Sequence, residues 1–112
     1  MEFPLHIRDI RQSDPFILAD EATHMYYTYA ARFNPEQFPW QKRGAFYALA
    51  SRDLIHWSEP QLVFEKEDFW ADLDYWAPEC HIWKGRYYII STFRAEGTYR
   101  GCQCLVADSP LG

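Results

Sequence analysis

Short runs of aromatic and β-branched residues recur along the chain, and polar or turn-forming residues separate them. Each run has the length of a β-strand and the residue types that fit a pleated, half-buried surface. No stretch repeats its apolar residues at the three- and four-residue spacing of an amphipathic helix, so little helix is expected. The pattern predicts an all-β protein whose strands cover residues 16–19, 25–30, 45–51, 62–64, 80–83, 86–93 and 102–107.

One connection between these runs has the composition of a tight hairpin. Lys84 and Gly85 separate the run 80–83 from the run 86–93. Glycine readily accepts the positive φ that a two-residue hairpin turn requires. These two runs are therefore predicted to pair as an antiparallel hairpin.

The strand pattern occurs twice along the chain. An Asp-Pro step at 14–15 and a Pro-Glu step at 78–79 each lead into a strand, a turn and a second strand with a Tyr-Tyr pair. A third strand follows in both copies, and a fourth follows in the first copy. Tandem four-stranded units are typical of β-propeller blades. We therefore expect blade one at about 14–65 and an incomplete blade two at about 76–112.

Two blades are too few to close a propeller, because the ring has about 4 to 8 blades around a central channel. At about 40 residues or more for each blade, a closed ring needs roughly 200 residues. The chain has 112 residues. Residues 1–112 are therefore expected to be the N-terminal portion of a longer propeller, an all-β unit of about two four-stranded antiparallel blades with the second incomplete.

Composition limits the classes of protein to which the chain can belong. Hydrophobic residues make up 48% and aromatic residues 19%, which excludes an intrinsically disordered chain. Surplus aromatic side chains are common where sugars stack, and an aromatic-rich β-sheet core is the other interpretation. The net charge of −5 and the lack of a run of basic residues argue against a nucleic-acid or an anionic-membrane partner.

Targeting segments and metal sites leave characteristic patterns, and neither pattern is found in this sequence. The N-terminal residues contain no apolar stretch of signal-peptide length, and no stretch approaches the roughly 20 residues of a membrane span. A cytoplasmic location is therefore expected. The three cysteines, Cys80, Cys102 and Cys104, lack the spacing of zinc sites, and the histidines show no metal-ligand spacing. No cofactor and no metal are expected.

Asp14 and Glu79 occupy equivalent positions in the two copies, each at the start of the first strand of a blade. The innermost strands of a propeller line its channel, so carboxylates at their starts would converge on one end of it. Convergent carboxylates are what glycoside hydrolysis requires, because one group protonates the leaving oxygen while another activates water. The other interpretation of Asp14 is a turn residue, since Asp-Pro is a common turn start.

Several motifs in a fixed order favour the first interpretation. Asp-Pro-Phe-Ile-Leu, Ser-Arg-Asp-Leu-Ile-His-Trp and Trp-Ala-Pro-Glu-Cys-His begin at residues 14, 51 and 76, and Tyr-rich strands follow the first and the last. Together they resemble glycoside hydrolase family 43 over essentially the whole chain. The resemblance implies a five-bladed β-propeller that acts as a β-xylosidase, an α-arabinofuranosidase, an arabinanase or a related galactan-cleaving enzyme. An oligosaccharide or a polysaccharide is then the expected substrate.

The resemblance also implies roles for individual residues. Asp14 matches the general base of the family, which activates water in an inverting mechanism. Glu79 falls on the acidic position after Trp-Ala-Pro, which implies an auxiliary carboxylate that orients the general acid and tunes its pKa. The general acid is a Glu of the third blade, beyond the sequence in hand. The 112-residue chain alone is therefore expected to be inactive.

Three tryptophans complete the set of candidate residues. Trp70 and Trp76 flank the approach to Glu79, where they could stack a sugar ring, and core packing between blades is an equally weighted alternative. Trp57 follows the third strand, away from the axis, and is expected to be structural. Two other interpretations of the whole chain stay open. One is a non-catalytic carbohydrate-binding propeller module that closes by oligomerisation, and the other is an inert truncated product.

Overall fold

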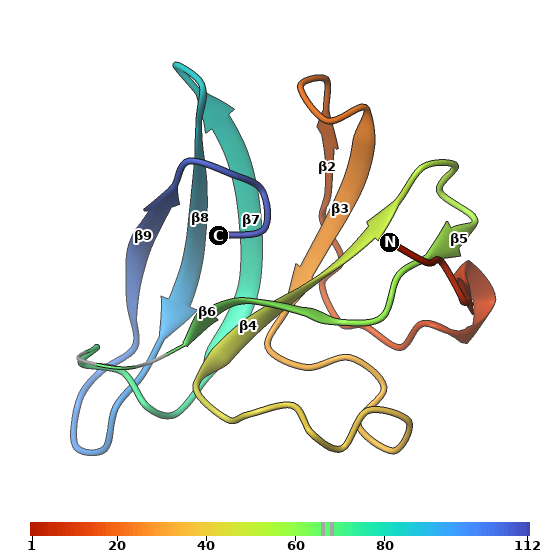
Figure 1. The fold of residues 1–112 in the computed structure, drawn as a ribbon. Helices are drawn as coiled ribbons and strands as arrows, with labels where there is room; N and C mark the ends of the chain where they lie inside the picture. Colours follow the sequence, from red (N-terminus) through yellow and green to blue (C-terminus); the bar gives the residue numbers. More distant parts are fainter. Residues whose placement is uncertain (66, 68) are drawn as a thin grey trace.

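The computed structural model describes residues 1–65, 67 and 69–112, and it consists of two antiparallel β-sheets that pack side by side (Figure 1). A single 3-10 turn, Ile7–Asp9, is the helical element of the described residues. The expectation of an all-β chain with little helix is confirmed. Within these residues no helix has the length and the apolar character that crossing a membrane requires.

The first sheet contains six strands, and β4 is its central strand. Strand β3 pairs with β4 on one side, and β2 pairs with β3 at the edge. On its other side β4 pairs with β6 along its first half and with β5 at its last residue, and β5 in turn pairs with β1. The strands are β1 (Leu5–His6), β2 (Ile17–Asp20), β3 (Met25–Ala30), β4 (Ala45–Ser51), β5 (His56–Trp57) and β6 (Gln61–Glu65).

The second sheet contains three strands in the order of the sequence. Its strands are β7 (Tyr75–Trp83), β8 (Arg86–Phe93) and β9 (Gly101–Ala107). The turn between β7 and β8 has positive φ at both Lys84 and Gly85, at 49° and 75°. Positive φ at two central residues is the geometry of a type I′ hairpin turn, so the predicted hairpin is confirmed.

Strand β7 begins at Tyr75, whereas the sequence pattern predicts a strand that starts only at Cys80. The difference arises from an irregularity in the pairing with β8: Trp76 is opposite Thr92, and Glu79 is opposite Ile90. Two residues of β7, Ala77 and Pro78, therefore lie opposite one residue of β8. Proline is tolerated at such a bulge because the local ladder hydrogen bond is already interrupted.

Strand β4 is buried along its whole length because side chains cover both of its faces. Tyr47 and Leu49 pack around Trp57 on one face. Phe46 and Ala48, on the other face, pack with residues of the second sheet. The exposed fraction of Trp57 is 1%, which confirms its predicted structural role. A strand that is covered on both faces reads as a continuous apolar run, as β4 does.

Buried hydroxyl groups link the two sheets. The Tyr87 hydroxyl of β8 lies 2.9 Å from both carboxylate oxygens of Asp20, the last residue of β2. The Tyr29 hydroxyl of β3 donates to the Pro110 carbonyl oxygen at 2.7 Å. Burial and the bond to Asp20 raise the pKa of Tyr87 to about 12, so this hydroxyl keeps its proton at neutral pH. These hydrogen bonds fix the position of the two sheets relative to each other.

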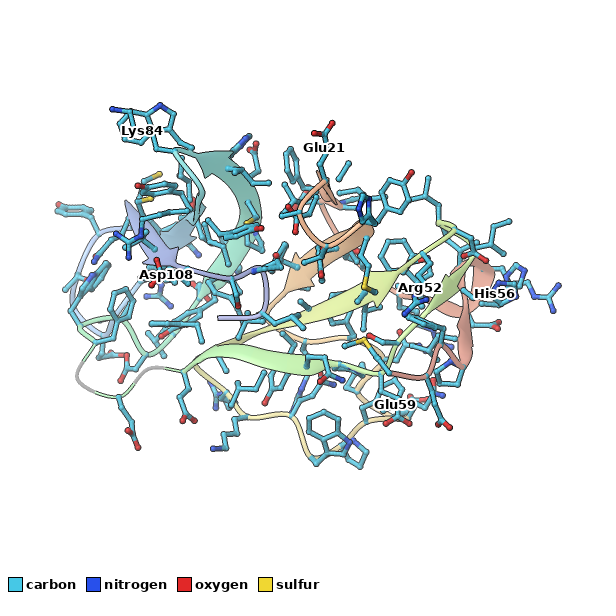
Figure 2. The ribbon with its side chains drawn as sticks, turned by 45° about the horizontal axis from the view of Figure 1, so that its top comes forward. Glu21, Arg52, His56, Glu59, Lys84 and Asp108 are labelled. Atoms are coloured by element: carbon cyan, nitrogen blue, oxygen red, sulfur yellow. The ribbon has the colours of Figure 1, made fainter. Side chains whose placement is uncertain are left out.

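Strands β2 and β7 point in the same direction, and their arrowheads lie at the top of Figure 1. Figure 2 shows Glu21 and Lys84 projecting from the turns that follow these strands. Strand β7 therefore starts at the opposite end of the molecule, whereas β2 starts beside the later part of β7, where Phe16 packs against His81 (Figure 1). The predicted site residue Trp76 belongs to the start of β7, which we call the strand-start end.

Candidate active site

Asp14 lies in the bend that precedes β2, and its side chain is exposed. Its φ of 49° is in the left-handed region, where Asp and Asn are enriched among residues that carry a side chain. Gln12 ties this bend to β3, because its amide Nε2 donates to the Tyr29 carbonyl oxygen at 2.8 Å and its Oε1 accepts from the Thr28 hydroxyl. The Gln12 side chain thus holds Asp14 just before the start of β2, with its carboxylate in solvent.

Glu79 lies inside β7 rather than at its start, and the bulge decides which way its side chain points. In a regular strand, residues three apart lie on opposite faces. The extra residue between Trp76 and Glu79 places both on the exposed face, while Tyr75 and Cys80 are buried on the other face. The Ser91 hydroxyl donates to the Trp76 carbonyl oxygen at 2.6 Å and fixes the start of the bulge.

The segments that carry Asp14 and Glu79 meet through aromatic side chains. The ring of Phe16, two residues after Asp14, lies 5.1 Å from the ring of His81, measured between centroids. The Nε2 atom of His81 lies 3.3 Å from Oε1 of Glu79, and both side chains are about half exposed. The structure therefore brings the two predicted carboxylate segments together at one surface.

Trp76 stands beside a network of two arginines and one carboxylate. The Arg100 guanidinium carbon lies 3.8 Å from the centre of the Trp76 ring, so it covers one ring face. Oδ2 of Asp74 accepts hydrogen bonds from Arg100 and from Arg94, both at 2.8 Å. The exposed fraction of Trp76 is 48%, which leaves ring surface available to a ligand.

Trp70 is separated from Trp76. Its ring packs against Phe93, with the centroids 6.4 Å apart, and its indole nitrogen donates to the side-chain carbonyl oxygen of Gln103. Phe93 is paired with Tyr75, whereas Trp76 is paired with Thr92, the residue that precedes Phe93. Adjacent residues of a strand point to opposite faces, so the two tryptophans do not form one stacking platform.

A cleft of about 250 Å³ opens at the strand-start end, and the sequence pattern does not predict it. Its lining includes Trp76, Asp74 and three basic residues, Arg32, Lys42 and Arg43. The basic residues precede β4, and the acidic and aromatic residues border β7, so no local motif indicates the site. A larger hollow of about 440 Å³ lies beside the 3-10 turn and is lined by none of the predicted site residues.

The cysteines and the acidic residues give no metal centre in the part of the chain that the structure describes. Cys80 is buried, and burial raises the pKa of its thiol. Cys102 and Cys104 are exposed on β9. No group of three or more His, Cys, Asp or Glu side chains of the described residues is arranged to hold a metal ion.

Comparison with known proteins places this fold among glycoside hydrolases. The sequence model described as Glycosyl hydrolases family 43 matches residues 7–112. An endo-arabinase from Bacteroides thetaiotaomicron VPI-5482 is 37% identical over 100% of the chain, with a TM-score of 0.84. A thermostable family-43 glycoside hydrolase is 26% identical over 88% of the chain, with a TM-score of 0.70. No curated protein matches.

A third solved structure shares the fold at lower identity. It is CoXyl43, a β-xylosidase/α-arabinofuranosidase from a compost microbial metagenome, with 18% identity over 99% of the chain and a TM-score of 0.72. The chain covers 36%, 30% and 36% of these three structures. It therefore spans about a third of the length of the enzymes that it matches.

Proposed function

Because the chain belongs to glycosyl hydrolase family 43, we propose that it forms part of a glycoside hydrolase that cleaves arabinofuranosyl or xylosyl bonds. The observation that supports this most directly is the 37% identity to an endo-arabinase over the whole chain, with a TM-score of 0.84. An arabinose-containing polysaccharide is therefore the substrate to test first.

In this proposal Asp14 is the general base of an inverting reaction. An inverting glycosidase needs one carboxylate to take a proton from water while an acid protonates the leaving oxygen, with the two groups about 6.5–9.5 Å apart. Asp14 suits the first task because its carboxylate is exposed just before β2, on the segment whose Phe16 packs against His81 of β7. Its left-handed backbone conformation, unusual for a residue before proline, is a strained geometry of the kind that clusters at functional sites.

For Glu79 the pairing with His81 favours contact with the substrate. The carboxylate of Glu79 and the imidazole of His81 lie side by side and are both about half exposed, so each can form hydrogen bonds with the hydroxyl groups of a sugar. We therefore propose that Glu79 and His81 together bind sugar hydroxyl groups. The auxiliary role that the family resemblance implies is the alternative, and the two roles predict different kinetics.

The substitution Asp14→Asn tests the general-base role. Asparagine keeps the shape of the side chain and tolerates positive φ, so the fold should be preserved while the base is lost. In the natural-length protein we expect kcat on linear arabinan or an aryl arabinofuranoside to fall by about 10²- to 10⁴-fold, measured by release of reducing sugar or the aryl group. The chain 1–112 alone should show no turnover, because the implied general acid lies outside it.

The matched control is Asp108→Asn. Asp108 is an exposed aspartate after β9 that pairs with Arg86 at 2.8 Å, and its substitution should leave kcat unchanged. Full turnover by a correctly folded Asp14→Asn protein would contradict the general-base role. Sugar binding without turnover in every variant and in the natural protein would favour the non-catalytic binding module.

A further inference from the structure

Basic side chains gather at the strand-start end, although the protein as a whole is acidic. The chain has 11 lysines and arginines against 16 aspartates and glutamates. Three basic residues line the cleft directly, and two more are bonded to its Asp74. Nearly half of the basic residues thus surround one cleft; they are Arg32, Lys42, Arg43, Arg94 and Arg100.

The strand pairing connects the walls of this cleft to the segments that carry the candidate carboxylates. Ile17, at the start of β2, pairs with Thr28, so the segment around Asp14 runs alongside the end of β3. Arg32 follows the end of β3 by two residues. On the other side of the cleft, Trp76 shares its exposed face of β7 with Glu79.

The carboxylates near the cleft neutralise only part of this charge. Asp74 is bonded to two arginines at once, so its single charge is exceeded by theirs. Lys42 pairs with Glu65 at 2.9 Å, and this bond raises the pKa of the lysine and keeps it charged. The negative charge of Glu67 also favours the charged form of Lys42. Asp72, which precedes Leu73 of the cleft lining, adds a fourth carboxylate. Five cations therefore face four carboxylates, and Arg32 and Arg43 are exposed at the cleft.

We propose that this cleft binds the carboxylate of a uronic acid unit in the polysaccharide substrate. Guanidinium groups bind carboxylates through two parallel hydrogen bonds, and Arg32 and Arg43 supply them. Arg100 covers one face of the Trp76 ring. The other face of this ring stacks against the ring of the same sugar. The cleft volume of about 250 Å³ suits one monosaccharide unit. This proposal deepens the proposed function and rests on it.

The test compares two sugar probes that differ in their carboxylates. Trigalacturonate and neutral galactotriose are titrated calorimetrically into the natural-length protein. A charge-assisted hydrogen bond contributes about 1.5–3 kcal/mol, so we expect trigalacturonate to bind about ten-fold more tightly or better. This preference should shrink when salt is raised from roughly 0.05 to 0.5 M, because exposed charges are screened. Equal affinity for the two probes would overturn the proposal.

Variants then locate the binding site. Arg43→Gln, alone and together with Arg32→Gln, should remove the preference for trigalacturonate and leave galactotriose binding unchanged. Lys84→Asn removes one positive charge in the β7–β8 turn at the other end of the molecule and should leave the preference intact (Figure 2). An equal loss in Lys84→Asn would mean a general charge effect, and binding of acetate as tight as that of the uronate would mean a bare anion site. Either result would overturn the proposal.

The binding readout is independent of catalysis. Loss of turnover on arabinan together with a retained uronate preference would overturn the proposed function and leave the cleft as a uronate-binding site. Turnover of arabinan without a preference for trigalacturonate would support the proposed function and contradict the proposal of a uronate-binding cleft. The two proposals can therefore fail separately.

Discussion

Glu79 and His81 form a pair whose chemistry decides how the second carboxylate of the site acts. Their side chains lie on the exposed face of β7 with 3.3 Å between Nε2 and Oε1, and Phe16 packs against the histidine ring. A residue that binds sugar hydroxyl groups changes substrate affinity. A residue that tunes the general acid changes the pH at which the enzyme works.

The substitution Glu79→Gln separates these roles. We expect KM on arabinan to rise several-fold with the alkaline limb of the pH profile unchanged, because a sugar contact is lost and no acid is retuned. If Glu79 tunes the acid, its neutralisation lowers the pKa of that acid, and the alkaline limb moves to lower pH. A shift of that limb would therefore contradict the contact role. Glu21→Gln, in the β2–β3 turn at the other end of the molecule, is the control and should change neither quantity (Figure 2).

At the scale of elements, the bulge in β7 sets the spacing of the site. Ala77 has a φ of 50°, which is costly for any residue with a Cβ and most costly for a β-branched one. Ala77→Val should lower the free energy of unfolding by about 1–3 kcal/mol, measured by urea denaturation. Ala77→Gly should leave it unchanged or raise it slightly, because glycine accepts this conformation. Equal stability of the two variants would contradict the account of the bulge.

The same element shows how far the sequence predicts the structure. Strands β3, β4 and β8 coincide with their predicted runs, because a run of aromatic and β-branched residues needs no distant partner to be recognised. Strand β7 is longer than predicted because Pro78 reads as a strand boundary, and only the pairing with β8 shows that a bulge accommodates it.

The candidate site, like the strands, is predicted only where a local motif marks it. The sequence motifs select Asp14 and Glu79 as candidates, and in the structure Phe16 and His81 bring the two segments together. The basic cleft is not predicted, because its residues come from two regions that meet only when β3, β4 and β7 pack together. Charge that is scattered along a sequence gives no local signal, whereas tertiary packing concentrates it.

At the scale of the whole molecule, the two faces of the second sheet differ. One face packs against β3 and β4 through residues such as Cys80, Tyr87 and Phe93. The opposite face leaves large apolar side chains exposed, including Ile90 at 48% and Val106 at 48%. The pairing places these two residues on the same face of neighbouring strands, and Glu79, opposite Ile90, marks the β7 border where this apolar surface ends and the candidate site begins. Contiguous apolar surface of this kind marks a contact face.

This face predicts the behaviour of the 112-residue chain prepared by itself. In a propeller the sheet of each blade packs between the sheets of two neighbouring blades. The uncovered face of the second sheet should therefore associate with a second copy of the chain. We expect sedimentation velocity to give a mass that rises above 13.4 kDa with concentration. Ile90→Lys should return the chain to a monomer, because a charge in an apolar contact is costly to desolvate.

Ile55→Lys is the matched control for this experiment. Ile55 is 47% exposed, and it lies in the loop before β5, on the first sheet and away from the face that contains Ile90. Its substitution should leave self-association unchanged, since Ile55 lies outside the apolar face of the second sheet. A chain that stays monomeric at all concentrations, or that Ile55→Lys dissociates as well as Ile90→Lys does, would show that the second sheet needs no neighbour on this face. In that case the contact between β7 and the first sheet would be sufficient to stabilise it.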